Sequence, residues 1–109
     1  MEKIKEFNNE QIQEIKEGLE NGLSYEQIGM YAKPEFCWEQ MQTIRIGIEE
    51  GLDVSIYAKP EFNWNQMEEI RIGLEEDIDV SVYAKPEIPW MEMAEMREEL
   101  DEIVINSIK

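Results

Sequence analysis

The sequence contains no histidine, a single cysteine (Cys37), and only 10 lysines and arginines among its 109 residues. Ser-His and Cys-His catalytic arrangements need histidine, and structural zinc sites need histidine or several cysteines, so these kinds of site are excluded. A lone cysteine also excludes an internal disulfide bond. We therefore predict a protein that is not an enzyme and that needs no metal and no cofactor.

Carboxylates are the one abundant type of reactive side chain. A pair of them can act as general acid and base, but only in a pocket that separates their pKa values, and no motif predicts such a pocket. Asp77 and Asp79 have a spacing found in calcium loops, yet the central glycine and terminal glutamate of such a loop are missing. The places equivalent to Cys37 hold Asn63 and Pro89, so a reactive thiol is not part of the repeat.

Long apolar runs are also absent. No run approaches the ~20 residues that a membrane-spanning helix needs, and the first residues lack the apolar segment of a secretory signal. With 42% apolar residues, the chain is long enough for one small core. We expect one soluble, cytoplasmic domain, residues 1–109, with no membrane partner.

The main positive feature is an internal repeat. Residues 31–56 return almost unchanged as residues 57–82, and the pattern begins again at Tyr83. The units are 1–30, 31–56, 57–82 and 83–109, of which the first is a diverged copy with an insertion. Units this short must bury their apolar stripes on one another. The predicted fold is all-α: a short helical-repeat stack, α-solenoid-like, of alternating long and short helices.

The third unit shows the long helix most clearly. Asn63 is the expected N-cap, because the proline three residues earlier disfavours helix before it. Trp64, Met67, Ile70 and Leu74 then follow at three- and four-residue spacing. This spacing predicts a buried helical stripe.

Other residues mark where helices end and begin. Gly51 suits the left-handed position after a long helix, and Asp53 is the expected cap of a short helix that follows. In the first unit, Ser24 and Gln27 form a capping-box pattern that predicts a short helix through Ala32. The apolar spacing of the last unit predicts a long helix that continues to about Ile108.

Two further positions bear on how the units pack. Glycines lie inside three predicted long helices, where each costs about 1 kcal/mol relative to alanine, so close packing is expected there. Ile46 and Ile72 in the middle units are replaced by Glu17 and Glu98 at the ends. This pattern predicts charged end units, as solenoids need, and therefore a monomer.

The charge is the second informative feature. Asp and Glu number 26 against 10 Lys and Arg, a formal net charge of −16, and every unit has an excess of acids. The charge therefore belongs to the fold and not to an acidic tail. Because each middle unit has one arginine and one lysine, we expect acidic rows on neighbouring helices without internal compensation. The candidate partner-binding residues are Glu49, Glu50, Glu68, Glu69, Glu75, Glu76, Asp101 and Glu102.

The consensus Asp-Val-Ser-x-Tyr-Ala-Lys-Pro-Glu-Phe-x-Trp-x-Gln-Met-x-x-Ile-Arg-x-Gly-Leu-Glu, here at residues 53–75, resembles short tandem repeats in uncharacterised proteins of bacterial mobile elements and phages. The resemblance covers roughly residues 31–100. It implies the cytoplasm of a bacterial cell or of a phage-infected host. It brings no catalytic residue and no established activity.

Two functions fit these features. The first is a non-catalytic inhibitor whose carboxylates mimic nucleic-acid phosphates and block a basic nucleic-acid-binding protein, for instance a nuclease. Acidic anti-CRISPR and anti-restriction proteins are similar in size and charge only. Direct binding of nucleic acid is disfavoured by the net charge, so Tyr31, Phe36 and Trp38 are interpreted as core and not as base-stacking residues.

The alternative is a protein-peptide adaptor. Helical repeats commonly bind peptides, and here the groove between the short and long helices would hold one. In this interpretation the acids serve only solubility. We take the phosphate-mimicking inhibitor as the first expectation, because it alone makes use of acids spread through every unit.

Overall fold

The computed structural model describes residues 6–107, and these residues contain helices and no strand. The long helices are α1 (Asn9–Glu20), α3 (Trp38–Glu49), α4 (Trp64–Glu75) and α5 (Trp90–Ser107). Between them lie α2 (Tyr25–Gly29) and two single 3-10 turns, η2 (Val54–Ile56) and η3 (Val80–Val82). The all-α prediction is confirmed. None of the helices within this range is long and apolar enough to cross a membrane.

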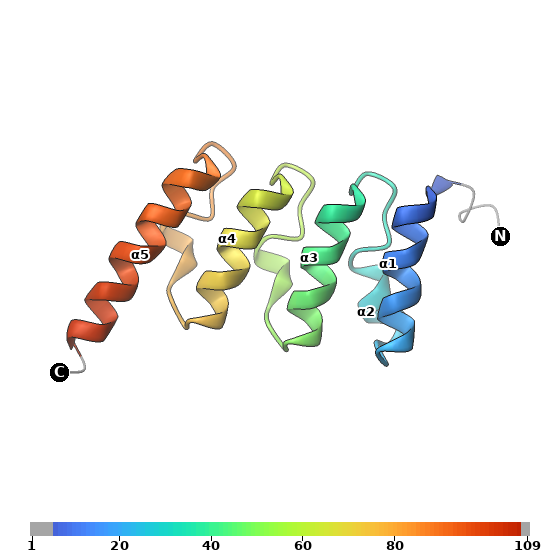
Figure 1. Ribbon diagram of the computed structural model, residues 1–109, viewed down its shortest axis with the longest axis horizontal. Coiled ribbons are helices and arrows are strands. Elements are labelled where there is room, and N and C mark those ends of the chain that lie inside the picture. Colours follow the sequence, from blue (N-terminus) through green and yellow to red (C-terminus); the bar gives the residue numbers. More distant parts are fainter. Residues whose placement is uncertain (1–5, 108–109) are drawn as a thin grey trace.

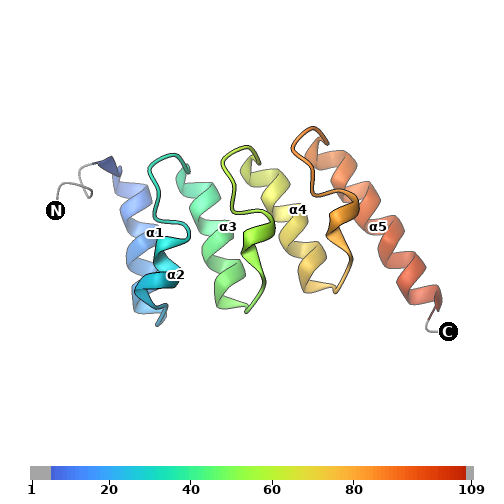
Figure 2. The same ribbon diagram turned by 180° about the vertical axis from the view of Figure 1, so that it is seen from behind.

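The long helices lie side by side in one row, with their N-terminal ends along the same edge (Figure 1). Seen from behind, the return segments that carry α2, η2 and η3 form a second layer over one face of the row (Figure 2). α1 packs against α3, α3 against α4, and α4 against α5. The result is an elongated array with extents of 54 × 28 × 17 Å.

The predicted N-caps are present. The Asn63 side chain accepts a hydrogen bond from the Gln66 N–H at 2.8 Å, and the Gln66 side chain accepts one from the Asn63 N–H at 2.9 Å. Ser24 and Gln27 form the same reciprocal pair at the start of α2. Each pair satisfies backbone donors that a helix end leaves without a partner, which fixes where the helix starts.

The short elements are shorter than predicted. α2 ends at Gly29 and not at Ala32, and the expected second helix is only one 3-10 turn, in which the Asp53 side chain accepts from the Ser55 N–H at 3.2 Å. In both places a proline follows closely, and the residue before a proline avoids the helical region. The return segments therefore have no room for longer helices.

A left-handed residue follows the long helices, as predicted for Gly51. Gly22 and Gly51 have φ angles of 88° and 76°, and Asp77 takes the equivalent place with a φ of 57°. Asp79 caps η3 by accepting from the Ser81 N–H. Both aspartates thus have local backbone roles, and residues 6–107 hold no cluster of three or more potential metal ligands.

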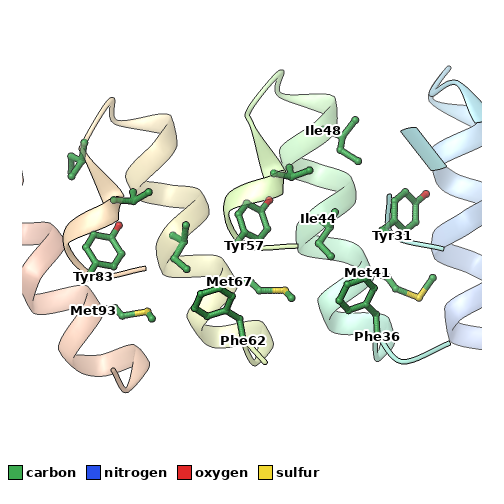
Figure 3. Packing of buried hydrophobic residues seen from close by; sticks show 14 of the residues in the cluster. Tyr31, Phe36, Met41, Ile44, Ile48, Tyr57, Phe62, Met67, Tyr83 and Met93 are labelled. Carbon is green, nitrogen blue, oxygen red and sulfur yellow. The ribbon is translucent and has the colours of Figure 1, made fainter. Parts of the chain in front are cut away.

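The core lies between the two layers, and buried tyrosines repeat along it (Figure 3). Tyr31, Tyr57 and Tyr83 are each 0% exposed. The Tyr57 hydroxyl donates to the carbonyl oxygen of Thr43 on the preceding long helix at 2.8 Å. Tyr31 and Tyr83 make the same bond to equivalent carbonyls on α1 and α4. Each bond fixes a return segment to its helix.

These tyrosines explain the glycines inside the long helices. A Cβ on Gly47 would overlap the Tyr57 hydroxyl and would lie 2.7 Å from Cγ1 of Val54. Gly18 and Gly73 face their own tyrosines in the same way. Because only hydrogen fits in this contact, the missing side chain lets the second layer approach the helix closely.

The stripe predicted on α4 is only partly correct. Met67 and Ile70 are each 0% exposed, but Trp64 is 43% exposed. Trp64 is the first residue of α4 and therefore lies at the edge of the array, where fewer neighbours cover it. Trp38 and Trp90 begin α3 and α5 and are each 38% exposed.

The prediction of charged end units is only partly confirmed, because Glu98 is exposed on the last helix but Glu17 is engaged in an ion pair. Glu17 turns toward the next helix and pairs with Arg45 at 3.0 Å, so it does not cover an end. At the other end, α5 exposes five large apolar side chains: Trp90, Met91, Ile103, Val104 and Ile105. α5 has 18 residues against 12 in α4, so its last turns extend beyond the row (Figure 1). It continues to Ser107, and the predicted end at Ile108 lies outside the described residues.

Replacing Gly47 by alanine should lower the free energy of unfolding by about 1–3 kcal/mol, because the added methyl group overlaps Tyr57 and Val54. Urea unfolding followed by circular dichroism measures the change. Gly29→Ala is the control, since no atom lies within 4 Å of that Cβ. It should be neutral or stabilising by up to about 1 kcal/mol. Equal effects of the two substitutions would contradict the tyrosine contact.

Alkaline pH should destabilise the folded protein. Burial raises the pKa of Tyr31 from 10.0 to about 12, and burial also raises the pKa values of Tyr57 and Tyr83. The unfolded chain releases these protons near pH 10 while the folded chain keeps them, so stability falls as pH rises from 10 toward 12. Urea midpoints measured across this range should decrease. Tyr57→Phe should make the decrease less steep, and buried phenolates that form without unfolding would contradict the argument.

Candidate functional site

Arginines at equivalent places in three successive units connect the acidic rows. Arg45, Arg71 and Arg97 have side chains that are 8%, 13% and 16% exposed. Each pairs with glutamates of a neighbouring helix, and Arg45 and Arg71 also pair with glutamates of their own. We call this set the arginine ladder; its acids are Glu14, Glu17, Glu49, Glu50, Glu68, Glu69, Glu75 and Glu76.

Arg71 shows how acids of two helices meet. Its Nη1 donates to Glu50, the residue that follows α3, at 2.8 Å and to Glu75 of α4 at 3.0 Å, and its Nη2 pairs with Glu68. A guanidinium group carries five donors in one plane, so it can hold several carboxylates at once. Three of the predicted partner-binding residues are thus brought together by one arginine.

The other two arginines repeat the arrangement. Arg97 on α5 donates to Glu69 of α4 at 3.1 Å and to Glu76, the residue that follows α4, at 3.0 Å. Arg45 binds Glu49 on its own helix at 2.9 Å. Six of the eight predicted partner-binding residues therefore belong to the arginine ladder.

The first arginine of the ladder, Arg45, pairs with a buried glutamate. Glu14 of α1 is 4% exposed and accepts from Arg45 Nε at 3.3 Å. Burial raises the pKa of the Glu14 carboxyl, and the nearby Arg45 only partly offsets this rise. For Arg45, burial lowers the pKa, but its glutamate partners more than compensate and the pKa is raised. The pair holds α3 against α1.

The expectation that the acidic rows lack internal compensation is therefore wrong. A projection of one helix shows which acids share a face, but it does not show an arginine that reaches over from the next helix. Eight glutamates share three guanidinium groups in the ladder, which leaves an excess of five negative charges. The ladder is still acidic, but its carboxylates are engaged in holding helices together.

The remaining two candidates stand apart. Asp101 and Glu102 lie on α5, and neither forms an ion pair with any residue from 6 to 107. Asp101 is half-buried and Glu102 is exposed. The structure thus divides the eight predicted residues into six that are paired and two that are not.

The ladder has one gap, at the interface of α3 and α4. On α1 and α4 the carboxylates of Glu14 and Glu69 accept from an arginine Nε, but the equivalent residue on α3 is Thr43. Thr43 Oγ1 and Arg71 Nε are both buried and have no hydrogen-bond partner in the described part of the chain. A buried donor without an acceptor costs about 1–3 kcal/mol, so this interface is weakened.

A second surface lies where the long helices begin. We call it the loop edge: the first residues of α3, α4 and α5 together with the loops 33–37, 59–63 and 85–89 (Figure 1). An open cavity of about 550 Å³ lies there. Trp64 and Pro60 supply apolar wall, and Glu61 and Glu87 are the charged residues that line it. Neither glutamate belongs to the arginine ladder.

Glutamines hold the loop edge in place. Gln66 accepts the cap N–H of its own helix, and its Nε2 donates to the carbonyl oxygens of Ile88 at 2.7 Å and Pro86 at 3.0 Å in the next loop. Gln40 bonds the following loop in the same way, at 2.6 Å from the Phe62 carbonyl oxygen. One buried side chain therefore caps a helix and fixes the neighbouring unit, so the loop edge is ordered before any partner arrives.

Within residues 6–107, the space between the short and long helices, where a groove was predicted, is occupied by buried side chains. That space is filled by the core, in which Tyr57 is 0% and Val54 is 1% exposed. The sequence does hold a signal for the loop edge, because Lys-Pro-Glu and the following tryptophan recur in three units. Helical spacing alone predicts that the tryptophans are buried, so spacing within one helix does not reveal this surface.

Comparison with family models, with curated proteins and with solved structures finds no match to this chain. The resemblance to bacterial and phage repeats therefore stays a prediction. What the protein does has to be argued from the arginine ladder and the loop edge.

Thr43→Glu should raise the free energy of unfolding by about 1 kcal/mol, because the new carboxylate gives buried Arg71 Nε an acceptor. Denaturant unfolding of the variant measures the gain. The control is the same substitution in an Arg71→Lys background, where Nε is missing and the gain should vanish. An equal gain in both backgrounds would rule out the gap as its source.

Proposed function

We propose that the protein is a non-catalytic acidic helical-repeat module that binds a basic protein partner. The observation that carries this proposal is the charge of −16 distributed over every unit. The arginine ladder still leaves five of its own negative charges without a cation. Such a field attracts a basic partner, speeds its association and becomes weaker as salt rises.

Within this function, the geometry favours an adaptor over a phosphate mimic. A mimic needs carboxylates that are free to replace phosphates, and six of the eight candidate carboxylates are held by arginines. The arginines are little exposed, so withdrawing their glutamates would leave a guanidinium group that is largely out of water with fewer partners. An adaptor instead uses surfaces whose side chains are not engaged, as helical repeats commonly do.

Phosphate mimicry of the anti-CRISPR or anti-defence type is the second candidate. It is favoured by the net charge and by Asp101 and Glu102, which lie outside the ladder. In this function the protein occupies the nucleic-acid channel of a basic nuclease in a bacterial or phage-infected cell. Unlike an adaptor whose acids serve only solubility, the adaptor proposed above uses its negative charge, so the two candidates share a basic partner and differ in the surface that meets it.

The shared part of the proposal is tested with oligoarginine and oligoglutamate peptides of equal length. We expect oligoarginine to bind at low salt and to lose about tenfold or more in affinity when the salt concentration is raised to about 0.5 M, since a shorter screening length weakens surface charge. Isothermal titration calorimetry measures the affinity for each peptide at low and at high salt. Absence of binding at low salt, or equal binding of both peptides, would refute a basic partner.

Mimicry has its own test. The protein is added to a basic nuclease bound to a fluorescent duplex, and the fluorescence anisotropy reports release of the duplex. Release at low salt that is lost at high salt would favour mimicry over the adaptor. If the duplex stays bound while oligoarginine still binds the protein, mimicry is ruled out for that nuclease and the adaptor stands.

A further inference from the structure

We infer that the loop edge is a docking surface for an extended basic peptide that carries arginine or lysine at every third residue. The inference deepens the proposed function and rests on it, because it names the chemistry of the basic partner. It is based on tryptophan and loop residues that are exposed and yet recur in three units.

All three tryptophans of the chain lie at the loop edge. Trp38, Trp64 and Trp90 are each the first residue of a long helix, and each leaves 38–43% of its surface exposed. One exposed apolar residue is ordinary on a protein surface, but the same exposed ring in three successive units forms a row. The face of an indole ring attracts cations, and arginine most often.

The residues that stay identical from unit to unit also indicate a ligand at the loop edge. Between the third and fourth units, buried Phe62 becomes Ile88 and buried Ile70 becomes Met96. The exposed Lys-Pro-Glu of the loops and the tryptophan nevertheless stay identical in three units. Several buried positions thus vary, although buried Tyr31, Tyr57 and Tyr83 are identical as well, while this exposed segment stays constant. A ligand that meets each unit in the same way would keep the exposed segment constant.

Charge selects the kind of ligand. Glu61 and Glu87 line the cavity, and neither forms an ion pair within the described range. The neighbouring lysines, Lys59 and Lys85, are exposed but do not line the cavity. A helix N-terminus adds only about half a positive charge, less than either carboxylate. The cavity therefore favours a cation over an anion.

Spacing selects the conformation of the ligand. Packed helices lie about 8–10 Å apart, so tryptophans that begin adjacent helices are separated by about this distance. A polyproline II chain has three residues per turn and rises about 3.1 Å per residue, so the same face recurs about every 9 Å. Side chains at every third residue would therefore meet successive tryptophans. The glutamine bonds fix the loops beforehand, which lowers the ordering cost of binding.

The experiment uses synthetic peptides and the intrinsic fluorescence of the protein. Because every tryptophan lies at the loop edge, a fluorescence change reports on this surface. The probe peptide repeats Arg-Pro-Pro, a second has the same number of arginines as Arg-Pro repeats, and a third repeats Glu-Pro-Pro. We expect the Arg-Pro-Pro peptide to change the fluorescence and to bind about tenfold more tightly than the Arg-Pro peptide, with no binding of the acidic one.

Matched variants locate the site. Glu61→Gln with Glu87→Gln removes two charges at the loop edge, and Asp101→Asn with Glu102→Gln removes two charges on α5. The first pair should weaken binding about tenfold and the second about twofold, since only the first faces the peptide. Trp64→Leu keeps apolar bulk, removes the ring and should weaken binding by about tenfold. Unfolding midpoints confirm that each variant is folded.

The outcomes separate the two proposals. If the Arg-Pro-Pro peptide binds without a fluorescence change, or if both pairs of charge substitutions have equal effects, the loop edge is not the docking surface. The proposal that the partner is basic would still hold. Equal affinity for the Arg-Pro peptide would overturn the three-residue spacing. If no arginine peptide binds at low salt, the proposed function itself fails. Binding of Glu-Pro-Pro would overturn the charge argument for the cavity.

Discussion

The fold depends on the contact between a tyrosine of each return segment and a glycine of the preceding long helix. The tyrosine hydroxyl donates to a helix carbonyl oxygen, as Tyr57 does to Thr43 at 2.8 Å, and only glycine leaves room for the ring. This contact sets how closely the two layers approach. The contact is made three times, so α1, α3 and α4 repeat the same two-layer packing, and the long helices begin along one edge. Without it, neither the arginine ladder nor the loop edge would recur in register.

The acidic composition has two separate physical consequences. Glutamates on the sides of the helices are shared among three little-exposed arginines and hold neighbouring helices together. Because acids outnumber arginines there, the same arrangement leaves the surface negative. Glutamates at the loop edge, such as Glu61, are not drawn into the ladder and stand beside exposed tryptophan. Glutamate thus holds helices together in the arginine ladder and remains available to a partner at the loop edge.

Local features could be predicted because their causes lie within a few residues. The Asn63 cap, the Ser24 capping box and the left-handed Gly51 all depend on neighbours no more than four residues away, and all three are confirmed. Burial was harder, since helical spacing put Trp64 in the core although it is the first residue of its helix. For the candidate site, spacing predicted which acids lie near one another but not the arginines between them. Arg71 reaches Glu50 across 21 residues of sequence, and Arg45 reaches Glu14 across 31.

The sequence by itself determined the repeat, the all-α class, the starts of the long helices and the excess of negative charge, because these follow from composition and short-range spacing. Only the tertiary structure decided which carboxylates are paired, that the space under the short helices is filled, and that a row of tryptophans remains exposed. The physical reason is that pairing and burial depend on what the next unit places against each side chain. Spacing within a single helix carries no information about that neighbour.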